Sequence, residues 1–161
     1  MQRLSFSELC GFWEKQWLAT ETADTHKYML FGGSRGPGKS YWLRWYGVRR
    51  LMKWAQEGHR GVRVMLACED YPALYERHVT KIQTEFPAWL GEYRAGRNEY
   101  QLNAAYGSGV MALRNLDDAS KYQSAEYAGM LVDEIGKNSY RTFNLLRGSL
   151  RWPGVQRTHF M

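Results

Sequence analysis

Residues 33–40 read Gly33-Ser34-Arg35-Gly36-Pro37-Gly38-Lys39-Ser40, which fits the pattern G-x-x-x-x-G-K-[S/T] at every fixed position. A short apolar run before it, residues 27–31, predicts a buried parallel strand, and a helical pattern follows it over residues 39–57. Glycines allow successive backbone N–H groups to turn toward phosphate oxygens, and the first turn of a helix adds further N–H donors. The stretch therefore predicts a phosphate-binding loop between a strand and a helix.

Helical and strand-like patterns alternate along the rest of the chain. Helices are expected over residues 5–18, 39–57, 72–86 and 139–150, a loop over residues 20–26, and strands over residues 27–31, 62–68, 127–132 and 155–160. Residues 100–103 and 109–113 flank a glycine-containing turn, which predicts a β-hairpin near 100–114. This alternation is typical of an α/β fold with a mostly parallel central sheet flanked by helices. Together with the loop, it predicts a P-loop NTPase of the ASCE (RecA-like) type.

A second motif is the apolar run Met130-Leu131-Val132, which ends in two acids, Asp133 and Glu134. In open α/β sheets ligands collect at the carboxyl ends of the strands, so we expect Asp133 to lie beside the loop. Lys39 would reach the β- and γ-phosphates, and the Ser40 hydroxyl and Asp133 would hold Mg²⁺. Glu134 is placed to polarise the water that attacks the γ-phosphate. GTPases and small-molecule kinases usually lack the second acid, and no N-K-x-D motif occurs, so the pattern predicts hydrolysis of ATP.

Composition excludes several other classes of protein. The 22 Lys and Arg against 16 Asp and Glu give a net charge of +6, which permits an anionic partner without requiring one. A length of 161 residues favours one domain, and two cysteines are too few for a disulfide framework. The four histidines show no metal-ligand spacing, no G-x-S-x-G motif occurs, and no apolar run approaches the roughly 20 residues that span a bilayer. A zinc site, a serine nucleophile and membrane insertion are therefore not expected, and the chain is expected to be intracellular.

The loop, the acidic strand end and three flanking elements resemble the large terminase subunit of tailed double-stranded DNA phages, the motor that packages the genome into a procapsid. In that family the loop reads G-G-x-x-G-x-G-K-S, which the glycine pair Gly32-Gly33 and the rest of the loop match here. Gln16 corresponds to an upstream glutamine that contacts adenine. Residues 116–126 resemble a stretch found before the acidic strand, and residues 145–151 resemble a helix end found after it.

The resemblance implies an ATP-hydrolysing motor domain over residues 1–161, with residues 1–26 as an N-terminal helix and loop and residues 27–161 as the core. The chain is then expected to be a truncated form without the C-terminal nuclease domain of the family. The implied partners are double-stranded DNA, the portal protein, the small terminase subunit and other copies of the chain in a ring on the portal. The implied location is the cytoplasm of the infected host, and transiently the procapsid. The implied nucleotide-binding residues are Gln16, Gly33, Ser34, Arg35, Gly36, Pro37, Gly38, Lys39 and Ser40.

Arginines are further candidates, because hydrolysis in such motors needs a cation to offset charge on the transferring phosphoryl group. Arg35 could act on the nucleotide of its own subunit, while Arg147 and Arg151 could act on that of a neighbour. The helix over residues 39–57 carries a charged face that is expected to be solvated rather than bound to DNA, formed by Arg44, Arg49, Arg50 and Lys53. Three tryptophans of the same helix are expected in the core: Trp42, Trp45 and Trp54.

Two other functions stay open at this point. A ring helicase or recombination ATPase would share the same catalytic residues, although helicases with a D-E-A-D or D-E-x-H box fit poorly because the chain reads Asp133-Glu134-Ile135-Gly136. A nucleotide-binding assembly module without turnover would use the loop to hold ATP as a structural ligand. Turnover by the wild type and by Glu134→Ala distinguishes this last function from an ATPase.

Overall fold

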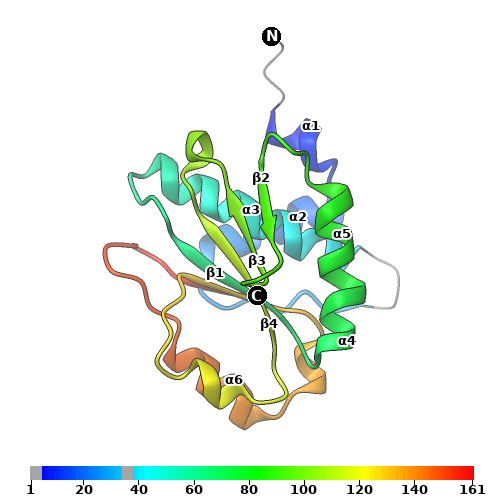
Figure 1. The fold of residues 1–161 in the computed structure, drawn as a ribbon, viewed down its shortest axis with the longest axis vertical. Coiled ribbons are helices and arrows are strands. Elements are labelled where there is room, and N and C mark those ends of the chain that lie inside the picture. The colour runs from blue at the N-terminus through cyan, green and yellow to red at the C-terminus, as the bar shows by residue number, and fades with distance from the viewer. Residues whose placement is uncertain (1–4, 34–37) are drawn as a thin grey trace.

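A six-stranded sheet forms the centre of the computed structural model, which describes residues 5–33 and 38–161 (Figure 1). The strands lie in the order β2-β3-β4-β1-β5-β6. Their bounds are β1 Arg63–Cys68, β2 Gly91–Arg94, β3 Glu99–Leu102, β4 Val110–Asn115, β5 Gly129–Val132 and β6 His159–Phe160. The helices are α1 Phe6–Cys10, α2 Glu14–Thr25, α3 Lys39–Gln56, α4 Tyr71–Leu74, α5 Thr80–Glu85 and α6 Tyr140–Gly148.

The sheet is parallel on one side of its centre and antiparallel on the other. Strand β1 pairs in parallel with both β4 and β5, and β5 pairs in parallel with β6. Strands β3 and β4 are antiparallel, which confirms the hairpin predicted near 100–114, and β2 adds a further antiparallel strand at the edge. Strand β2 was not predicted from the sequence, since its four residues alternate between exposed and half-buried positions and contain no apolar run. The predicted α/β class is confirmed.

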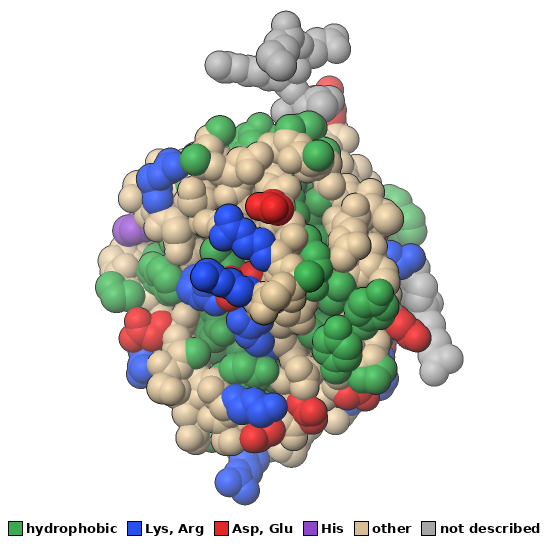
Figure 2. Space-filling view, in the orientation of Figure 1, with side chains coloured by type: hydrophobic (Ala, Val, Ile, Leu, Met, Phe, Trp, Pro, Cys, Tyr) green, Lys and Arg blue, Asp and Glu red, His purple; other side chains and the backbone are tan. Residues whose placement is uncertain are grey.

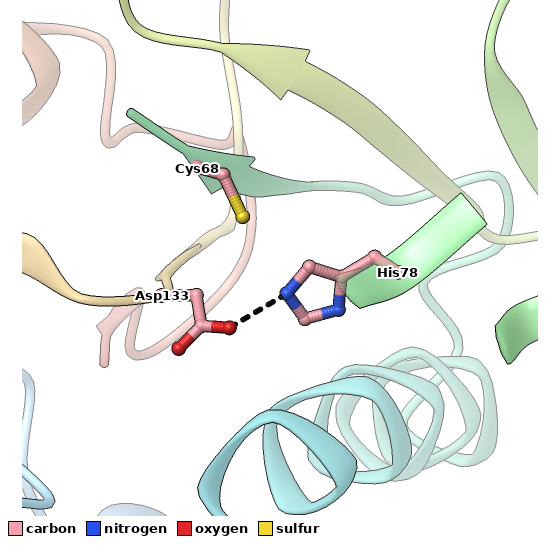
Figure 3. Close-up of side chains that lie close together, drawn as sticks. All are labelled: Cys68, His78 and Asp133. Atoms are coloured by element: carbon pink, nitrogen blue, oxygen red, sulfur yellow. Dashed lines mark hydrogen bonds and ion pairs between the residues drawn. The ribbon is translucent and has the colours of Figure 1, made fainter. Parts of the chain in front are cut away.

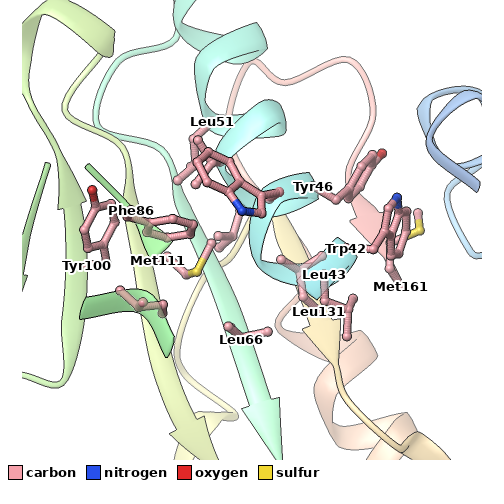
Figure 4. Packing of buried hydrophobic residues seen from close by; sticks show 14 of the residues in the cluster. Trp42, Leu43, Tyr46, Leu51, Leu66, Phe86, Tyr100, Met111, Leu131 and Met161 are labelled. Carbon is pink, nitrogen blue, oxygen red and sulfur yellow. The ribbon is translucent and has the colours of Figure 1, made fainter. Parts of the chain in front are cut away.

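Two hydrophobic clusters cover the two faces of the sheet. Alternate residues of β1 point to opposite faces, so Val64 and Leu66 face α3 while Met65 and Ala67 face α6. Figure 4 shows the α3 side, where this helix lays its apolar residues over the strands: Trp42, Leu43, Tyr46 and Leu51 on the helix, and Leu66, Met111 and Leu131 on the sheet. The predicted burial of Trp42, Trp45 and Trp54 is confirmed.

The N-terminal region departs from its prediction. Instead of one helix over residues 5–18, it has two, because Gly11 adopts the left-handed conformation (φ 57°) that ends α1. The second helix, α2, continues through the stretch predicted as a loop over residues 20–26. Hydroxyls of Thr20 and Thr22 donate to the carbonyls four residues earlier, and Ala23 is buried against α3, so tertiary packing holds a polar sequence in a helix.

Within the described residues, one predicted strand is absent from the structure, and another is much shorter than predicted. Residues 27–31 form no regular strand; Tyr28 makes a single parallel bridge to Phe160, and the Leu30 side chain is 77% exposed. The apolar side chains of this segment border a cavity, and Phe31 packs edge-on against Trp42 rather than joining a ladder. The last strand, predicted over residues 155–160, is reduced to β6.

The helix predicted over residues 72–86 is interrupted by a wider turn. Asp70 caps α4, and between α4 and α5 lies one π-helical turn, Tyr75–Val79. A π-turn inserts an extra residue into the helical repeat and is often found at functional sites. Within the part of the chain that the structure describes, none of the helices has the length and apolar character needed to cross a membrane.

Candidate functional site

The two sequence motifs meet at one end of the parallel part of the sheet. The Ser40 hydroxyl, in the first turn of α3, donates to Asp133 Oδ2 at 2.6 Å, across 93 positions of sequence. Leu131 of β5 faces α3 and Val132 faces the other side, so Asp133, the next residue in the alternation, points back toward the start of α3. The prediction that Asp133 lies beside the loop is confirmed.

A cavity of about 740 Å³ opens between the two motifs. Gly33 and Lys39 border it on the loop side, and Asp133 and Glu134 border it at the end of β5. The remaining wall is mostly apolar, with Tyr28, Met29, Leu30, Phe31, Trp42, Leu43, Val132, Ile135, Phe143, Phe160 and Met161. A concave site with an apolar wall and a few convergent polar groups is the usual form of a small-molecule site.

The described part of the loop has the geometry that the glycine pattern predicts. Gly38 adopts a left-handed conformation (φ 69°), and a Cβ built there would lie 2.7 Å from Gln16 Nε2, so a side chain fits neither the backbone nor the space. Lys39 Nζ donates to the Gly33 carbonyl at 3.0 Å, which holds the ammonium at the cavity edge. The predicted site residues Ser34, Arg35, Gly36 and Pro37 lie outside the described residues.

Gln16 is buried beneath the loop. Its amide nitrogen donates to the Gly38 carbonyl at 3.0 Å, and its amide oxygen accepts from the Trp13 backbone N–H at 2.9 Å. It therefore connects α2 to the start of α3, and it is not among the described residues that border the cavity. Its contact with adenine stays a prediction.

Glu134 adopts an unusual backbone conformation for a residue with a side chain, with φ 54° and ψ 51°. Such left-handed residues cost free energy and cluster at functional sites. The conformation turns the chain sharply after Asp133, and both acids border the cavity. The Glu134 carboxylate is 47% exposed and lies 3.6 Å from Lys137 Nζ.

Behind Asp133 lies a buried network that the sequence did not predict. His78 Nε2 lies 3.0 Å from Asp133 Oδ2, and the thiol of Cys68, at the end of β1, is directed toward both side chains (Figure 3). On the other side of the imidazole, Arg44 contacts His78 Nδ1 at 3.2 Å. No motif signals His78, because it reaches Asp133 through the π-turn and a helix–strand contact rather than through spacing in sequence.

Electrostatics keep Asp133 ionised and His78 neutral. Burial alone would raise the pKa of Asp133, but hydrogen bonds from His78 and Ser40 outweigh it and hold that pKa below its ordinary value. Burial lowers the pKa of His78, and the nearby cations of Arg44 and Arg77 lower it further, against the opposing effect of Asp133. Ser40 and Asp133 present oxygen atoms side by side, which are the ligands that Mg²⁺ prefers, so the residues present fit this ion.

The basic residues of α3 are not a solvated face, so that prediction is wrong. Arg44 is 3% exposed and forms a two-pronged ion pair with Glu85. Three other cations of the helix surround a single carboxylate, Asp24 of α2: Arg49 at 2.8 Å, Arg50 at 3.4 Å and Lys53 at 2.9 Å. These residues are paired with two half-buried acids, Glu85 and Asp24, which the sequence of the helix does not reveal.

The two candidate arginines near α6 lie on the surface. Arg151 pairs with Glu126 at 3.1 Å, and the exposed Arg147 guanidinium lies 5.7 Å from the centre of the Phe143 ring. On the face drawn in Figure 2, Lys and Arg side chains are interspersed with acidic and hydrophobic ones rather than gathered in a field of one sign. The action of Arg147 and Arg151 on a neighbouring subunit stays a prediction.

Comparisons with known proteins give structural matches only. No protein-family model and no curated protein sequence matches this chain. The fold is similar to that of the large terminase of a thermophilic bacteriophage, with a TM-score of 0.69, 16% sequence identity, and coverage of 91% of this chain and 38% of that one. The complex of that terminase with ATP-gamma-S gives a TM-score of 0.63 at 14% identity over 97% of this chain and 36% of that one.

The complex of the same terminase with ADP gives a TM-score of 0.66 at 14% identity over 92% of this chain and 38% of that one. This chain thus spans between a third and two fifths of the length of those structures. At the level of fold, the predicted resemblance is confirmed. Over about nine tenths of its residues, the chain has the fold of part of a phage large terminase.

Proposed function

We propose that this chain is an ATP-hydrolysing motor domain of the large-terminase type, which powers the movement of double-stranded DNA into a procapsid. The observation that carries the proposal is the direct contact of Ser40 with Asp133, which borders the same cavity as Lys39 and Glu134. The fold match to a terminase crystallised with ATP-gamma-S and with ADP supports a nucleotide in this cavity.

Each residue has a role in this proposal. Backbone N–H groups at the start of α3 and the Lys39 ammonium bind the phosphates. Ser40 and Asp133 hold Mg²⁺, which offsets phosphate charge when it is bound. Glu134, on its left-handed turn at the cavity edge, orients and polarises the attacking water.

The partners in this proposal follow from the terminase resemblance. They are double-stranded DNA, a portal protein, a small terminase subunit and further copies of this chain in a ring. A net charge of +6 is compatible with a DNA partner. The location in the host cytoplasm, and transiently on a procapsid, belongs to the same proposal.

The proposal is tested by steady-state ATPase activity and by nucleotide binding. We expect Lys39→Ala to lose nucleotide binding, and Glu134→Ala to keep binding while turnover falls about 100-fold or more. Lys81→Ala and Glu21→Ala are matched controls, because both residues lie on the surface and neither borders the cavity among its described lining.

The outcomes separate the alternative functions. Equal turnover of wild type and Glu134→Ala removes the catalytic role of Glu134. Wild-type binding without turnover favours a nucleotide-dependent assembly module. Turnover stimulated by a forked duplex, accompanied by strand separation, favours a helicase.

A further inference from the structure

We propose that His78 is a positioning residue, which fixes the Asp133 carboxylate for magnesium binding through the chain Glu85–Arg44–His78–Asp133. The inference rests on the proposed nucleotide site and extends it to residues that no sequence motif marks. Its elements are α5, α3, the π-turn and the end of β5, which meet behind the cavity.

The neighbours of the His78 imidazole determine which of its two nitrogens carries the proton. Arg44 Nη1 lies 3.2 Å from His78 Nδ1, and a guanidinium group can only donate hydrogen bonds. Nδ1 must therefore accept, which places the proton of the neutral ring on Nε2. Nε2 lies 3.0 Å from Asp133 Oδ2, where the ionised carboxylate needs a donor. Both ends of the ring thus require the same tautomer.

The Arg44 guanidinium, which sets this tautomer, is held rigidly. Arg44 Nε and Nη2 donate to the two oxygens of Glu85 at 2.9 and 2.7 Å, and Nη1 also donates to the Arg77 carbonyl at 2.6 Å. The Arg44 side chain is 4% exposed and the His78 side chain is fully buried. A two-pronged pair of this kind fixes the guanidinium plane, so the imidazole has one available orientation.

Cys68, His78 and Asp133 form a cluster whose possible ligand atoms lie within 4.8 Å of one another. Such a cluster could suggest a transition-metal site. The tautomer set by Arg44 argues against it, because a protonated Nε2 has no lone pair to give to a metal. His78 therefore faces Asp133 as a hydrogen-bond donor.

The hydrogen bond from His78 holds one oxygen of the Asp133 carboxylate in place. Among the described residues, the side-chain hydrogen bonds to its carboxylate come from Ser40 and His78, and both end on Oδ2. When the Ser40 oxygen is used for Mg²⁺, His78 remains to hold Oδ2. Oδ1 then keeps a fixed direction. Partners of this type orient metal-binding groups, and their loss typically weakens metal binding about 10- to 100-fold.

The experiment measures binding of a fluorescent N-methylanthraniloyl ATP, first in EDTA and then during a Mg²⁺ titration. We expect His78→Leu to change the affinity in EDTA less than about twofold, and to raise the Mg²⁺ concentration for half-maximal enhancement of binding about tenfold or more. His78→Gln, whose amide can both donate and accept, should recover most of this loss. His59→Leu is the matched control. An unchanged Mg²⁺ dependence in His78→Leu overturns the inference.

A second measurement observes the imidazole of His78 directly in the wild-type protein and uses a variant only to assign its signals. Long-range ¹H–¹⁵N correlation spectra of the wild type report the tautomer of each histidine, with the His78 signals assigned from their absence in His78→Gln. We expect the neutral Nε2–H form for His78. A neutral Nδ1–H form or an imidazolium overturns the inference. Failure of Lys39→Ala to reduce binding would instead overturn the proposed function, so the two failures are distinguishable.

Discussion

At the scale of single residues, one carboxylate oxygen of Asp133 joins Ser40 to His78. Asp133 Oδ2 accepts hydrogen bonds from Ser40, which precedes it by 93 positions, and from His78, which precedes it by 55. A buried carboxylate that kept neither donor would bear the full cost of its desolvation. The two donors are therefore expected to be coupled in their effect on stability.

Urea unfolding of Ser40→Ala, His78→Leu and the double variant tests this coupling. Either single variant leaves Oδ2 with one donor, whereas the double variant leaves it with none. We expect the double loss of unfolding free energy to exceed the sum of the single losses by about 0.5–3 kcal/mol. The cycle of Ser40→Ala with His59→Leu should be additive. An additive result for Ser40 and His78 would contradict the shared role of Oδ2.

At the scale of elements, α2 and α3 are joined through Asp24. Three cations of α3 surround this carboxylate: Arg49, Arg50 and Lys53. Burial alone would raise the pKa of Asp24, but hydrogen bonds from Arg49 and Lys53 outweigh it and lower that pKa to about 2. The carboxylate is thus ionised more readily in the folded chain than in the unfolded one, where its pKa is 3.8.

The pH dependence of Asp24→Asn follows from this shift. A lowered folded-state pKa stabilises the fold fully above the unfolded value of about 4, and this contribution is lost as the pH falls from about 4 to about 2. We expect the variant to be less stable than wild type by about 2–3 kcal/mol at pH 7, with the difference shrinking below pH 4. Urea unfolding of both proteins at several pH values measures it. A constant difference from pH 7 to pH 3 would show that charge is not the cause.

A second element-scale prediction concerns α3 and the sheet. Trp42 is fully buried, stacks on Tyr46 with ring centres 4.8 Å apart, and donates its indole N–H to Thr20. We expect Trp42→Ala to lower the free energy of unfolding by about 3–5 kcal/mol, because it removes these contacts and leaves a void. Chemical denaturation measures the loss. Exposed Trp13→Ala is the control and should cost less than about 1 kcal/mol.

At the scale of the whole molecule, the proposed ligand joins segments that are far apart in sequence. A ligand that binds only the folded state stabilises it by about 2.7 kcal/mol at 100 times its dissociation constant. For a chain of this length, that corresponds to a rise in melting temperature of roughly 5–10 °C. We expect this rise with ATP and Mg²⁺ in wild type, and none in Lys39→Ala, by differential scanning fluorimetry. Equal shifts in both proteins would place the nucleotide elsewhere.

Much of the fold, and the position of Asp133 beside Ser40, could be predicted because they depend on patterns of residues that are close in sequence. The glycine pattern, the apolar run before Asp133 and the hairpin turn each carry their own chemistry within a few residues. His78 and its partner Arg44 could not be found in this way, because their roles come from contacts between separate elements. The failed strand at residues 27–31 has a similar cause, since its apolar side chains face a cavity instead of a second layer.

Strand β6 is two residues long, yet it lies between β5, which is followed by Asp133, and the segment that precedes the loop predicted to bind phosphate. Phe160 exchanges backbone hydrogen bonds with Lys27 and Met29 at 2.6 and 3.0 Å on one side, and Met161 bonds to Met130 and Val132 at 2.8 Å on the other. The few backbone hydrogen bonds on each side oppose relative twisting of the neighbouring segments less than the longer row of hydrogen bonds between two full-length strands does. We therefore expect residues 27–31 to move more easily against the rest of the sheet than two fully paired strands would, and a ligand that contacts both sides of this short pairing to restrict the movement.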